Sequence, residues 1–480
     1  MAETDAAAHG DPTMTGRPYQ RFRDATQSRR HGNGIAQRHL RARLTELSSV
    51  DRNTETTVTT AVTIPQSNFL TAAMPDTPPG ADPLPGHLDR WLSAKGADLV
   101  AVRRHLHAHP EVSGQEFRTA QLIMKHLAEA GLAPRMLPAR NGVICDIRGS
   151  DVNGEVVALR ADLDALPLAD TKDVPYRSTV EGVCHACGHD VHTAILLGAG
   201  LALAQLAARG ELPGTVRLLF QPSEEAPPGG APSMIAAGGL RDVAAIFGMH
   251  CAPQLPVGTV GVRSGPFTAA TDIVEVAVHG AGGHTARPHL TADLVDALGR
   301  IVVGLPSLVN KRIDPRSNIS VVFGAIHAGE AANTIPSAGY ARATVRALSR
   351  EAWRAAPDLI TELVHEVAAP TGAKVEIDYK RYVPPVVNDR LATAVIAGAA
   401  AAALGPDRVI EAEVSMGGED FAFYLEQVPG AMVRLGTGAP GATDTFDIHQ
   451  GSFDVDERAI AHGVRVFVHT ALAALATPAF

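Results

Sequence analysis

The chain has 480 residues, of which 45% are hydrophobic and 19% are charged, a composition typical of a globular protein. Domains usually span roughly 100–200 residues, so a chain of this length predicts two or three units. The formal net charge of -9 argues against broad nucleic-acid binding, because that requires a concentrated basic surface.

The cysteines and the apolar segments indicate in which cellular compartment the protein is expected. Four cysteines are too few to cross-link a chain of this size, and they lie among histidines and apolar stretches: Cys145, Cys184, Cys187 and Cys251. This pattern favours a reducing compartment and predicts a cytoplasmic protein. The first residues do not resemble a secretory signal. The long apolar stretch Ala394 to Leu404 is only about half as long as a membrane span, so we expect a buried helix there and no membrane partner.

Residues 1–85 differ in composition from the rest of the chain. They are rich in Thr, Arg, Pro and Ala and show little hydrophobic periodicity, which predicts a disordered extension. Between Arg17 and Arg43 there are eight arginines and one acidic residue, Asp24. This segment could be an interaction arm or an organelle-targeting stretch, although a solvated tail is the simpler interpretation.

From residue 86 onwards, apolar strands alternate with helices, which indicates an α/β fold. We expect helices at about 89–107, 118–130 and 191–208. Near-continuous apolar runs predict strands of a sheet with helices on both faces, at 142–148, 156–160, 215–220, 244–248 and 431–435.

The order of elements changes between residues 271 and 379. The pattern predicts strands at 272–278, 318–326, 338–347 and 374–379, with helices at 292–309 and 351–368. This is a ferredoxin-like β-α-β-β-α-β unit. We therefore expect an inserted domain, 271–379, between the two parts of a larger catalytic domain, 86–270 and 380–480.

Polar clusters follow the predicted strands of the larger domain. Asp162-Leu163-Asp164, Glu224-Glu225 and His250 come directly after strands, and His449 follows a loop. Ligands of open α/β sheets bind beyond the carboxyl ends of the strands, so we expect these side chains to converge at one sheet edge.

The segment from Cys184 to Asp190 adds a thiol and imidazoles. Cys187 and His189 are two residues apart, so in an extended segment both side chains would point to the same side, as two ligands of one ion. A thiolate with imidazole suits zinc, nickel or a similar late metal, and a nearby carboxylate also tolerates manganese. A bound metal would keep Cys187 ionised.

The two carboxylates of Glu224-Glu225 can play different roles in hydrolysis. Consecutive extended residues project in opposite directions, so one carboxylate could bind metal while the other takes a proton from water. Each cluster alone has a simpler explanation: a solvated turn, surface charge or a hydrogen-bonded histidine. Their joint appearance after successive strands favours a metal site.

These motifs resemble a known family. Residues 159–167 read LRADLDALP, and they are followed by HACGHD at 185–190, QPSEE at 221–225 and GMH at 248–250. The ordered set closely resembles the amidohydrolase branch of the aminoacylase and carboxypeptidase-G-like di-metal metallopeptidases, over about residues 90–475. That branch includes hippurate hydrolases, N-acyl-amino-acid amidohydrolases and indoleacetyl-amino-acid hydrolases.

The resemblance implies a site with two divalent metal ions. Cys187 would bridge the two ions, of which one would also bind His189 and His250 and the other Glu225 and His449. Glu224 would be the general base and acid. Asp164 would orient a ligand histidine, and Asp162 would be a supporting residue, since other branches carry a ligand histidine at its position.

The inserted domain also matches the family, through residues 280–289 and 332–336. In relatives this domain mediates dimerisation, and its histidine reaches across to the partner's site. The resemblance therefore implies a homodimer, with His284 stabilising the oxyanion of the substrate and Asn333 contacting the substrate.

Two features depart from the family pattern. Relatives often carry an apolar residue at the position of Cys184, which here forms a Cys-x-x-Cys pair that could be a redox switch or a zinc knuckle; we interpret it as a bystander. The residues around His449 also differ from the expected motif.

The resulting prediction is a hydrolase that cleaves N-acyl amino acids, hippurate-like or N-acetylated, by metal-activated water, with zinc, manganese, nickel or cobalt as the ion. The alternatives are a dipeptidase, a ureido-type hydrolase, or a silent metal-binding scaffold.

Overall fold

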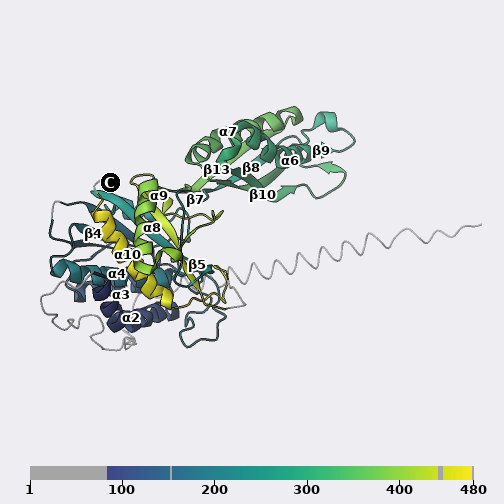
Figure 1. Ribbon diagram of the computed structural model, residues 1–480. Helices are drawn as coiled ribbons and strands as arrows, with labels where there is room; N and C mark the ends of the chain where they lie inside the picture. Colours follow the sequence, from purple (N-terminus) through teal and green to yellow (C-terminus); the bar gives the residue numbers. More distant parts are fainter. Residues whose placement is uncertain (1–83, 152–153, 442–446, 478–480) are drawn as a thin grey trace, which may run out of the picture. The chain divides into compact units, whose positions relative to one another are not determined.

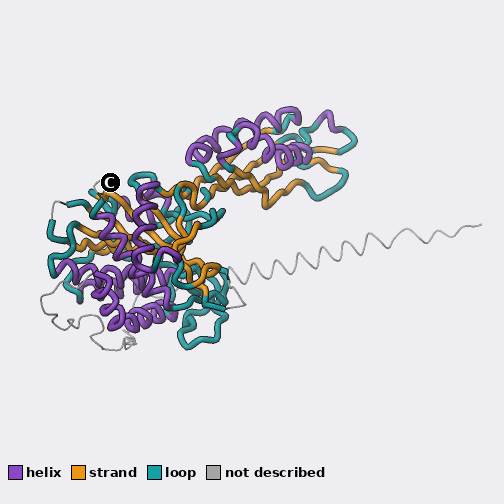
Figure 2. Tube along the Cα trace, viewed as in Figure 1, coloured by secondary structure: helices purple, strands orange, loops and turns teal. Residues whose placement is uncertain are grey.

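The structure of the protein is a computed structural model, which describes residues 84–151, 154–441 and 447–477. Figure 1 traces the chain and Figure 2 distinguishes its helices from its strands. The predicted extension, residues 1–85, therefore lies almost entirely outside the described residues.

The centre of the larger part is a mixed eight-stranded sheet. Its strand order is β1-β2-β4-β3-β5-β16-β6-β15. Strands β4, β3, β5 and β16 run parallel to one another, whereas β2 is antiparallel to β4 and β6 to β16. The strands span Arg135–Met136 (β1), Val143–Arg148 (β2), Val156–Asp162 (β3), Thr215–Gln221 (β4), Val243–Pro256 (β5), Val260–Val262 (β6), Val409–Glu411 (β15) and Gly430–Gly438 (β16).

Five helices bury their apolar side chains against one face of this sheet. They are α2 (Leu84–Ala108), α3 (Phe117–Glu129), α4 (His189–Ala208), α8 (Arg390–Leu404) and α10 (Arg458–Leu475). Alternate strand residues such as Val157, Leu159 and Ala161 join them in one hydrophobic core. The alanines of α8 allow it to pack closely on α10, and Asp389 caps its first turn by accepting a hydrogen bond from the amide of Ala392.

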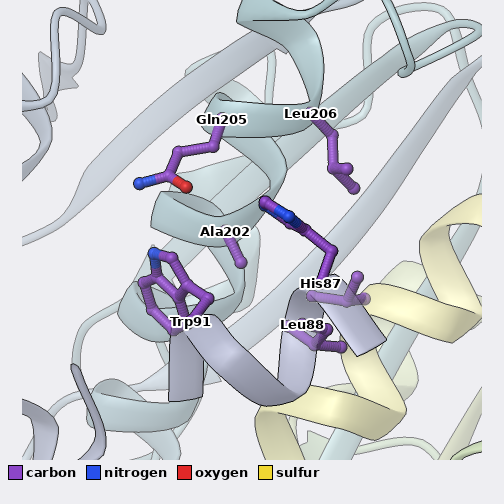
Figure 3. Close-up of a pocket in the computed structure, with 7 residues that line it drawn as sticks. His87, Leu88, Trp91, Ala202, Gln205 and Leu206 are labelled. Carbon is purple, nitrogen blue, oxygen red and sulfur yellow. The ribbon is translucent and has the colours of Figure 1, made fainter. Parts of the chain in front are cut away.

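Helix α4 is apolar on all sides because it lies inside this layer. It is long and apolar enough to cross a bilayer, but 78% of its most apolar window is buried inside the fold, as in the core helix of a globular domain. A helix of membrane-spanning length and apolarity was not predicted for this segment. Figure 3 shows α2 beside α4, with His87 and Trp91 of α2 next to Ala202, Gln205 and Leu206 of α4.

The other face of the sheet carries a second core of intervening strand residues. Ala158, Leu219 and Met432 point to this side, where short helices and loops cover them. The helices are α5 (Ala231–Ala236) and α9 (Ala422–Leu425), and a two-stranded ribbon of β7 (Gly265–Thr268) and β14 (Val386–Asn388) lies beside them.

A separate four-stranded antiparallel sheet forms between residues 271 and 383. Its strand order is β10-β12-β8-β13, with β8 (Thr271–His279), β10 (Ile319–Ala328), β12 (Ala338–Ala347) and β13 (Lys374–Val383). Helices α6 (Leu294–Arg312) and α7 (Arg350–Ala368) pack on it around their own hydrophobic core (Figure 1). Asp293 and Ser349 cap the two helices. A ribbon of β9 (Gly283–His284) and β11 (Thr334–Ile335) completes this region.

The predicted fold class is confirmed, but several elements differ from the predictions, among them β5 and α10. Strand β5 is longer than the predicted segment 244–248 because pairing with β16 continues past His250 as far as Pro256. Helix α10 was not predicted, although ten of its residues are buried.

Candidate metal centre

The parallel strands bring four distant segments to one edge of the large sheet. Asp162 is the last residue of β3 and pairs with Gln221, the last residue of β4, and Glu224-Glu225 follow three residues later. His250 pairs with Arg434 on β16. The expected convergence is therefore observed, but His250 lies within β5 and not after its end, because β5 continues beyond the neighbouring strands.

Cys187 and His189 converge by a different route from the predicted one. The segment is not extended: Gly188 has φ +90°, and His189 is already the first residue of α4. A β-carbon on Gly188 would lie 2.8 Å from the sulfur of Cys251, so the turn depends on glycine in both conformation and space. The left-handed turn places both side chains on one side.

Two groups of potential ligands share Cys187. Cys187, His189 and His250 form the first group, and Cys187, Glu225 and His449 form the second; within each group the ligand atoms lie within 4.8 Å of one another. The sulfur of Cys187 is 3.4 Å from Nε2 of His250, and Nε2 of His449 is 3.2 Å from Oε1 of Glu225. The structure thus brings together all five residues that the sequence singled out as ligands.

Glu224 and Glu225 both face this centre. They lie in a bend and not in a strand, and one oxygen of each carboxylate lies within 4.8 Å of a ring nitrogen of His189. The expectation that they project in opposite directions is therefore wrong. Both remain close enough to serve one site in different roles.

Asp164 fixes the orientation of two of these side chains. Its Oδ1 lies 3.2 Å from Nδ1 of His189, and its Oδ2 accepts hydrogen bonds from the amide of Glu225 at 2.9 Å and the hydroxyl of Ser113 at 2.6 Å. Because Nδ1 of His189 is held there, its Nε2 points into the centre.

Asp162 belongs to a supporting network that the sequence analysis did not foresee. The buried guanidinium of Arg160 donates to Asp162 at 2.6 Å and to Asp420 at 2.7 Å. Asp162 also lies 2.6 Å from Nδ1 of His192, whose Nε2 accepts a hydrogen bond from the amide of Cys251. The sequence did carry hints, since Arg160 is two residues before Asp162 on one strand face, and His192 is three after His189 on a helix.

The electrostatics of the centre favour a cation. Burial and the nearby carboxylates, Glu225 first among them, raise the pKa of the Cys187 thiol well above its usual value. Burial lowers the pKa of His189, but the charges of Asp162, Asp164 and Glu225 outweigh it and raise the value to about 10. A site that pulls positive charge onto a buried imidazole is also suited to a metal ion.

A buried nitrogen without a partner provides a second test of fit. Nε2 of His189 is buried and has no hydrogen-bond partner among the described residues. Buried polar atoms are normally paired, so a free ring nitrogen beside Cys187 and His250 suits a metal ligand. The other nitrogen of His250 is held by the carbonyl oxygen of Cys251 at 2.8 Å, which also orients this ring.

Three residues of interest lie apart from the centre. His284 and Asn333 are exposed on and beside the β9–β11 ribbon, and neither lines the cavity at the centre. Cys184 is buried, and no group of potential ligands in the described part of the chain includes it.

A cavity of about 440 Å³ opens onto the centre. Its wall includes Cys187, Glu224, Glu225, His250 and His449, together with Arg346 and Arg434. The volume falls within the range of pockets for small organic ligands, about 300–1,000 Å³.

Comparisons with known proteins agree with this site. The chain is 40% identical over 380 residues to the N-acetylcysteine deacetylase of Bacillus subtilis (strain 168). The aligned region covers 79% of this chain and 97% of that protein. It is 46% identical over 381 residues to a putative glutamate–cysteine ligase 2-3 of Rhodococcus jostii (strain RHA1), which covers 79% of this chain. The chain spans only about half of that relative, 47% of its length.

A solved structure shares both fold and sequence. The crystal structure of the Bacillus subtilis YXEP protein, described as a dinuclear metal-binding peptidase from the M20 family, matches with a TM-score of 0.70 and 38% identity over 79% of this chain and 98% of that one. The model of Peptidase family M20/M25/M40 matches residues 158–473, well over half of the chain. A match of that extent over the site-bearing strands shows that the chain belongs to this family of hydrolases of amide bonds.

Proposed function

We propose that this chain removes the acyl group from N-acyl amino acids, N-acetylated or hippurate-like, by hydrolysis of the amide bond. The observation that carries the proposal is the pair of ligand groups that share Cys187, beside the carboxylate of Glu224. The similarity to an N-acetylcysteine deacetylase supports the same substrate class.

The residues present suit two divalent ions. Cys187 would bridge them, with His189 and His250 completing one set of ligands and Glu225 and His449 the other. The thiolate and imidazoles suit zinc, nickel or cobalt, and the carboxylate extends the choice to manganese. Such ions, when bound, polarise an amide carbonyl and lower the pKa of water.

Glu224 would move the proton during hydrolysis. Burial raises the pKa of its carboxyl group well above the usual value, and the charges of Glu419, Glu225 and Asp420 raise it further. A carboxylate with a raised pKa accepts a proton from water readily near neutral pH. As the water oxygen attaches to the carbonyl carbon, Glu224 takes its proton, and as the C–N bond breaks it gives that proton to the departing nitrogen. The products are a carboxylate and a free amino acid.

The region 271–379 would form a dimerisation and lid domain. Its separate sheet and core support this division, and it exposes apolar side chains such as Val303 on α6, 80% exposed, and Val322 on β10, 60% exposed. In the dimer, His284 and Asn333 would act at the partner's site, since they do not line the cavity of their own chain. Sedimentation that showed a monomer at all concentrations would exclude this arrangement. The four free, buried cysteines suit a reducing compartment such as the cytoplasm.

The test is a substrate panel with a matched variant. The enzyme, reconstituted separately with zinc, manganese, nickel or cobalt, is incubated with N-acetyl amino acids, hippurate, dipeptides and ureido acids, and the freed amine is measured. We expect release from the N-acyl amino acids, and a fall in kcat of about 10²–10⁴-fold in Glu224→Gln with unchanged metal content. Turnover by that variant at the full rate, or cleavage of dipeptides alone, would contradict the proposal.

A further inference from the structure

Arg434 differs from the other buried arginines of this protein. The guanidinium of Arg103 pairs with Asp190 at 2.8 Å, and that of Arg160 pairs with Asp162 at 2.6 Å. Arg434 is half-buried on β16, and in the described part of the chain its guanidinium makes no ion pair and no side-chain hydrogen bond. Buried charges are normally paired, so an unpaired one indicates a missing partner.

The position of Arg434 relates it to the metal centre. It pairs with His250 across β5 and β16, so both side chains lie on the same face of the sheet, and both line the 440 Å³ cavity with Cys187 and Glu224. On the opposite side its neighbour on β6 is Gly261, which has no side chain to cover it.

The contacts that Arg434 does make position it without neutralising it. Its guanidinium carbon lies 5.0 Å from the centre of the Phe267 ring, a stacking that holds the group against the cavity wall. Burial lowers the pKa of Arg434, and the charges of Glu419 and Cys187 offset this only in part. An arginine stays protonated in proteins, so a positive charge faces the cavity.

A second guanidinium reaches the same cavity from β12. Arg346 donates hydrogen bonds to the hydroxyl of Thr271 at 2.6 Å and to the carbonyl oxygen of Met416 at 2.9 Å, and it too has no carboxylate partner among the described residues. Two arginines without acidic partners among the described residues therefore line one cavity, where they can bind an anion.

We propose that Arg434 binds a carboxylate of the substrate and makes the enzyme prefer substrates that carry one at the position this guanidinium reaches, with Arg346 as a second positive charge in the same cavity. This inference rests on the proposed function and adds a residue that determines its specificity. The carboxylate could belong to the amino acid or to the acyl chain, because the guanidinium recognises both in the same way.

Three substrates separate these sources. N-acetyl-leucine carries its carboxylate on the amino acid, N-succinyl-leucinamide carries it on the acyl chain, and N-acetyl-leucinamide has none. We expect the metal-reconstituted enzyme to prefer one carboxylate-bearing substrate over N-acetyl-leucinamide by about 30-fold or more in kcat/KM, the usual size of a desolvated charge pair. In Arg434→Gln that preference should fall to a few-fold through KM, because kcat/KM for the carboxylate-bearing substrate falls much further than kcat/KM for N-acetyl-leucinamide.

Controls distinguish recognition from general damage. Arg434→Lys keeps the charge and should retain part of the preference, whereas Arg354→Gln, which removes an exposed arginine of α7, should retain all of it. An unchanged preference in Arg434→Gln, or an equal loss of kcat for all three substrates, would overturn the proposal.

Calorimetry separates a failure of this inference from a failure of the proposed function. N-acetyl-leucine, N-succinyl-leucinamide and N-acetyl-leucinamide are titrated into Glu224→Gln and into Glu224→Gln/Arg434→Gln. One outcome is that the wild-type enzyme cleaves none of the three compounds, while a carboxylate-bearing compound binds more tightly than N-acetyl-leucinamide only when Arg434 is present. In that case the proposed function fails and the anion site stands. If cleavage occurs and binding ignores Arg434, only the anion site fails.

Discussion

Replacement of Asp164 by asparagine tests whether this carboxylate organises the metal centre. The carboxylate receives three groups: the His189 ring, the amide of Glu225 and the hydroxyl of Ser113. An asparagine has one acceptor oxygen and one donor nitrogen. In either orientation of the amide, its nitrogen would face a hydrogen-bond donor, so the substitution breaks one set of contacts while preserving volume.

The expected loss is large enough to measure. A hydrogen bond to a charged group contributes about 1.5–3 kcal/mol, and loss of such a supporting contact typically lowers metal affinity about 10–100-fold. Competition with a chromophoric zinc chelator reports the affinity, and circular dichroism confirms that the variant is folded. Ser113→Ala removes only one of the three contacts and should have a smaller effect. Wild-type affinity for both ions in a folded Asp164→Asn protein would refute this account of the centre.

Two further predictions concern Gly188, in the turn of the centre, and Asp170, which contacts His107. Gly188→Ala should reduce metal content and lower the unfolding free energy by about 1–2 kcal/mol or more. The reason is that φ +90° strains an alanine and that its β-carbon would meet Cys251. A variant with full metal content and wild-type stability would contradict this prediction. Contacts of Asp170 with His107, Ser178 and Lys172 outweigh the effect of burial and hold the pKa of its carboxyl group below the usual 3.8. The ionised carboxylate therefore stabilises the native state above pH 3.8, and this contribution is lost as the pH falls below it. Urea unfolding of wild type and Asp170→Asn should therefore differ most above about pH 5, and the difference should shrink steadily as the pH falls below about 4. A difference independent of pH would contradict the assignment.

The elements of the fold could be predicted where local pattern alone determines them. The four strands of the small sheet and its two helices were expected within a few residues, because alternating strands such as β8 and amphipathic helices such as α7 bury one face each. The β9–β11 ribbon was not predicted. Strand β5 could not be delimited, since its second half contains Pro253 and Pro256 and is held by pairing with β16, a partner about 180 residues away.

The site was predictable by residue type but not by geometry. Asp162, Glu224 and Glu225 follow strands that were expected to lie in one sheet, so their convergence at one sheet edge could be expected. The turn at Gly188 and the bend at Glu224 could not, because they depend on φ angles and on contacts with other segments. Arg434 could have been found, since an arginine inside the apolar strand from Ala431 to Leu435 is unusual for a buried strand.

The carboxylates of the centre show how one environment assigns different roles to the same chemical group. Burial alone would raise the pKa of Asp162, Asp164 and Glu224. For Asp162 the charges of His189 and Arg160 outweigh burial, and for Asp164 the hydrogen bond and charge of His189 do so. Both pKa values stay below their usual value, so these groups remain ionised and hold imidazoles in place. Around Glu224 the neighbours Glu419, Glu225 and Asp420 add to the effect of burial, so its pKa rises. When surroundings lower the pKa of some carboxylates and raise that of another, the first can support the ligands while the second transfers protons. The surroundings of Glu224, more than its place in the motif, therefore make it the group suited to carry the proton.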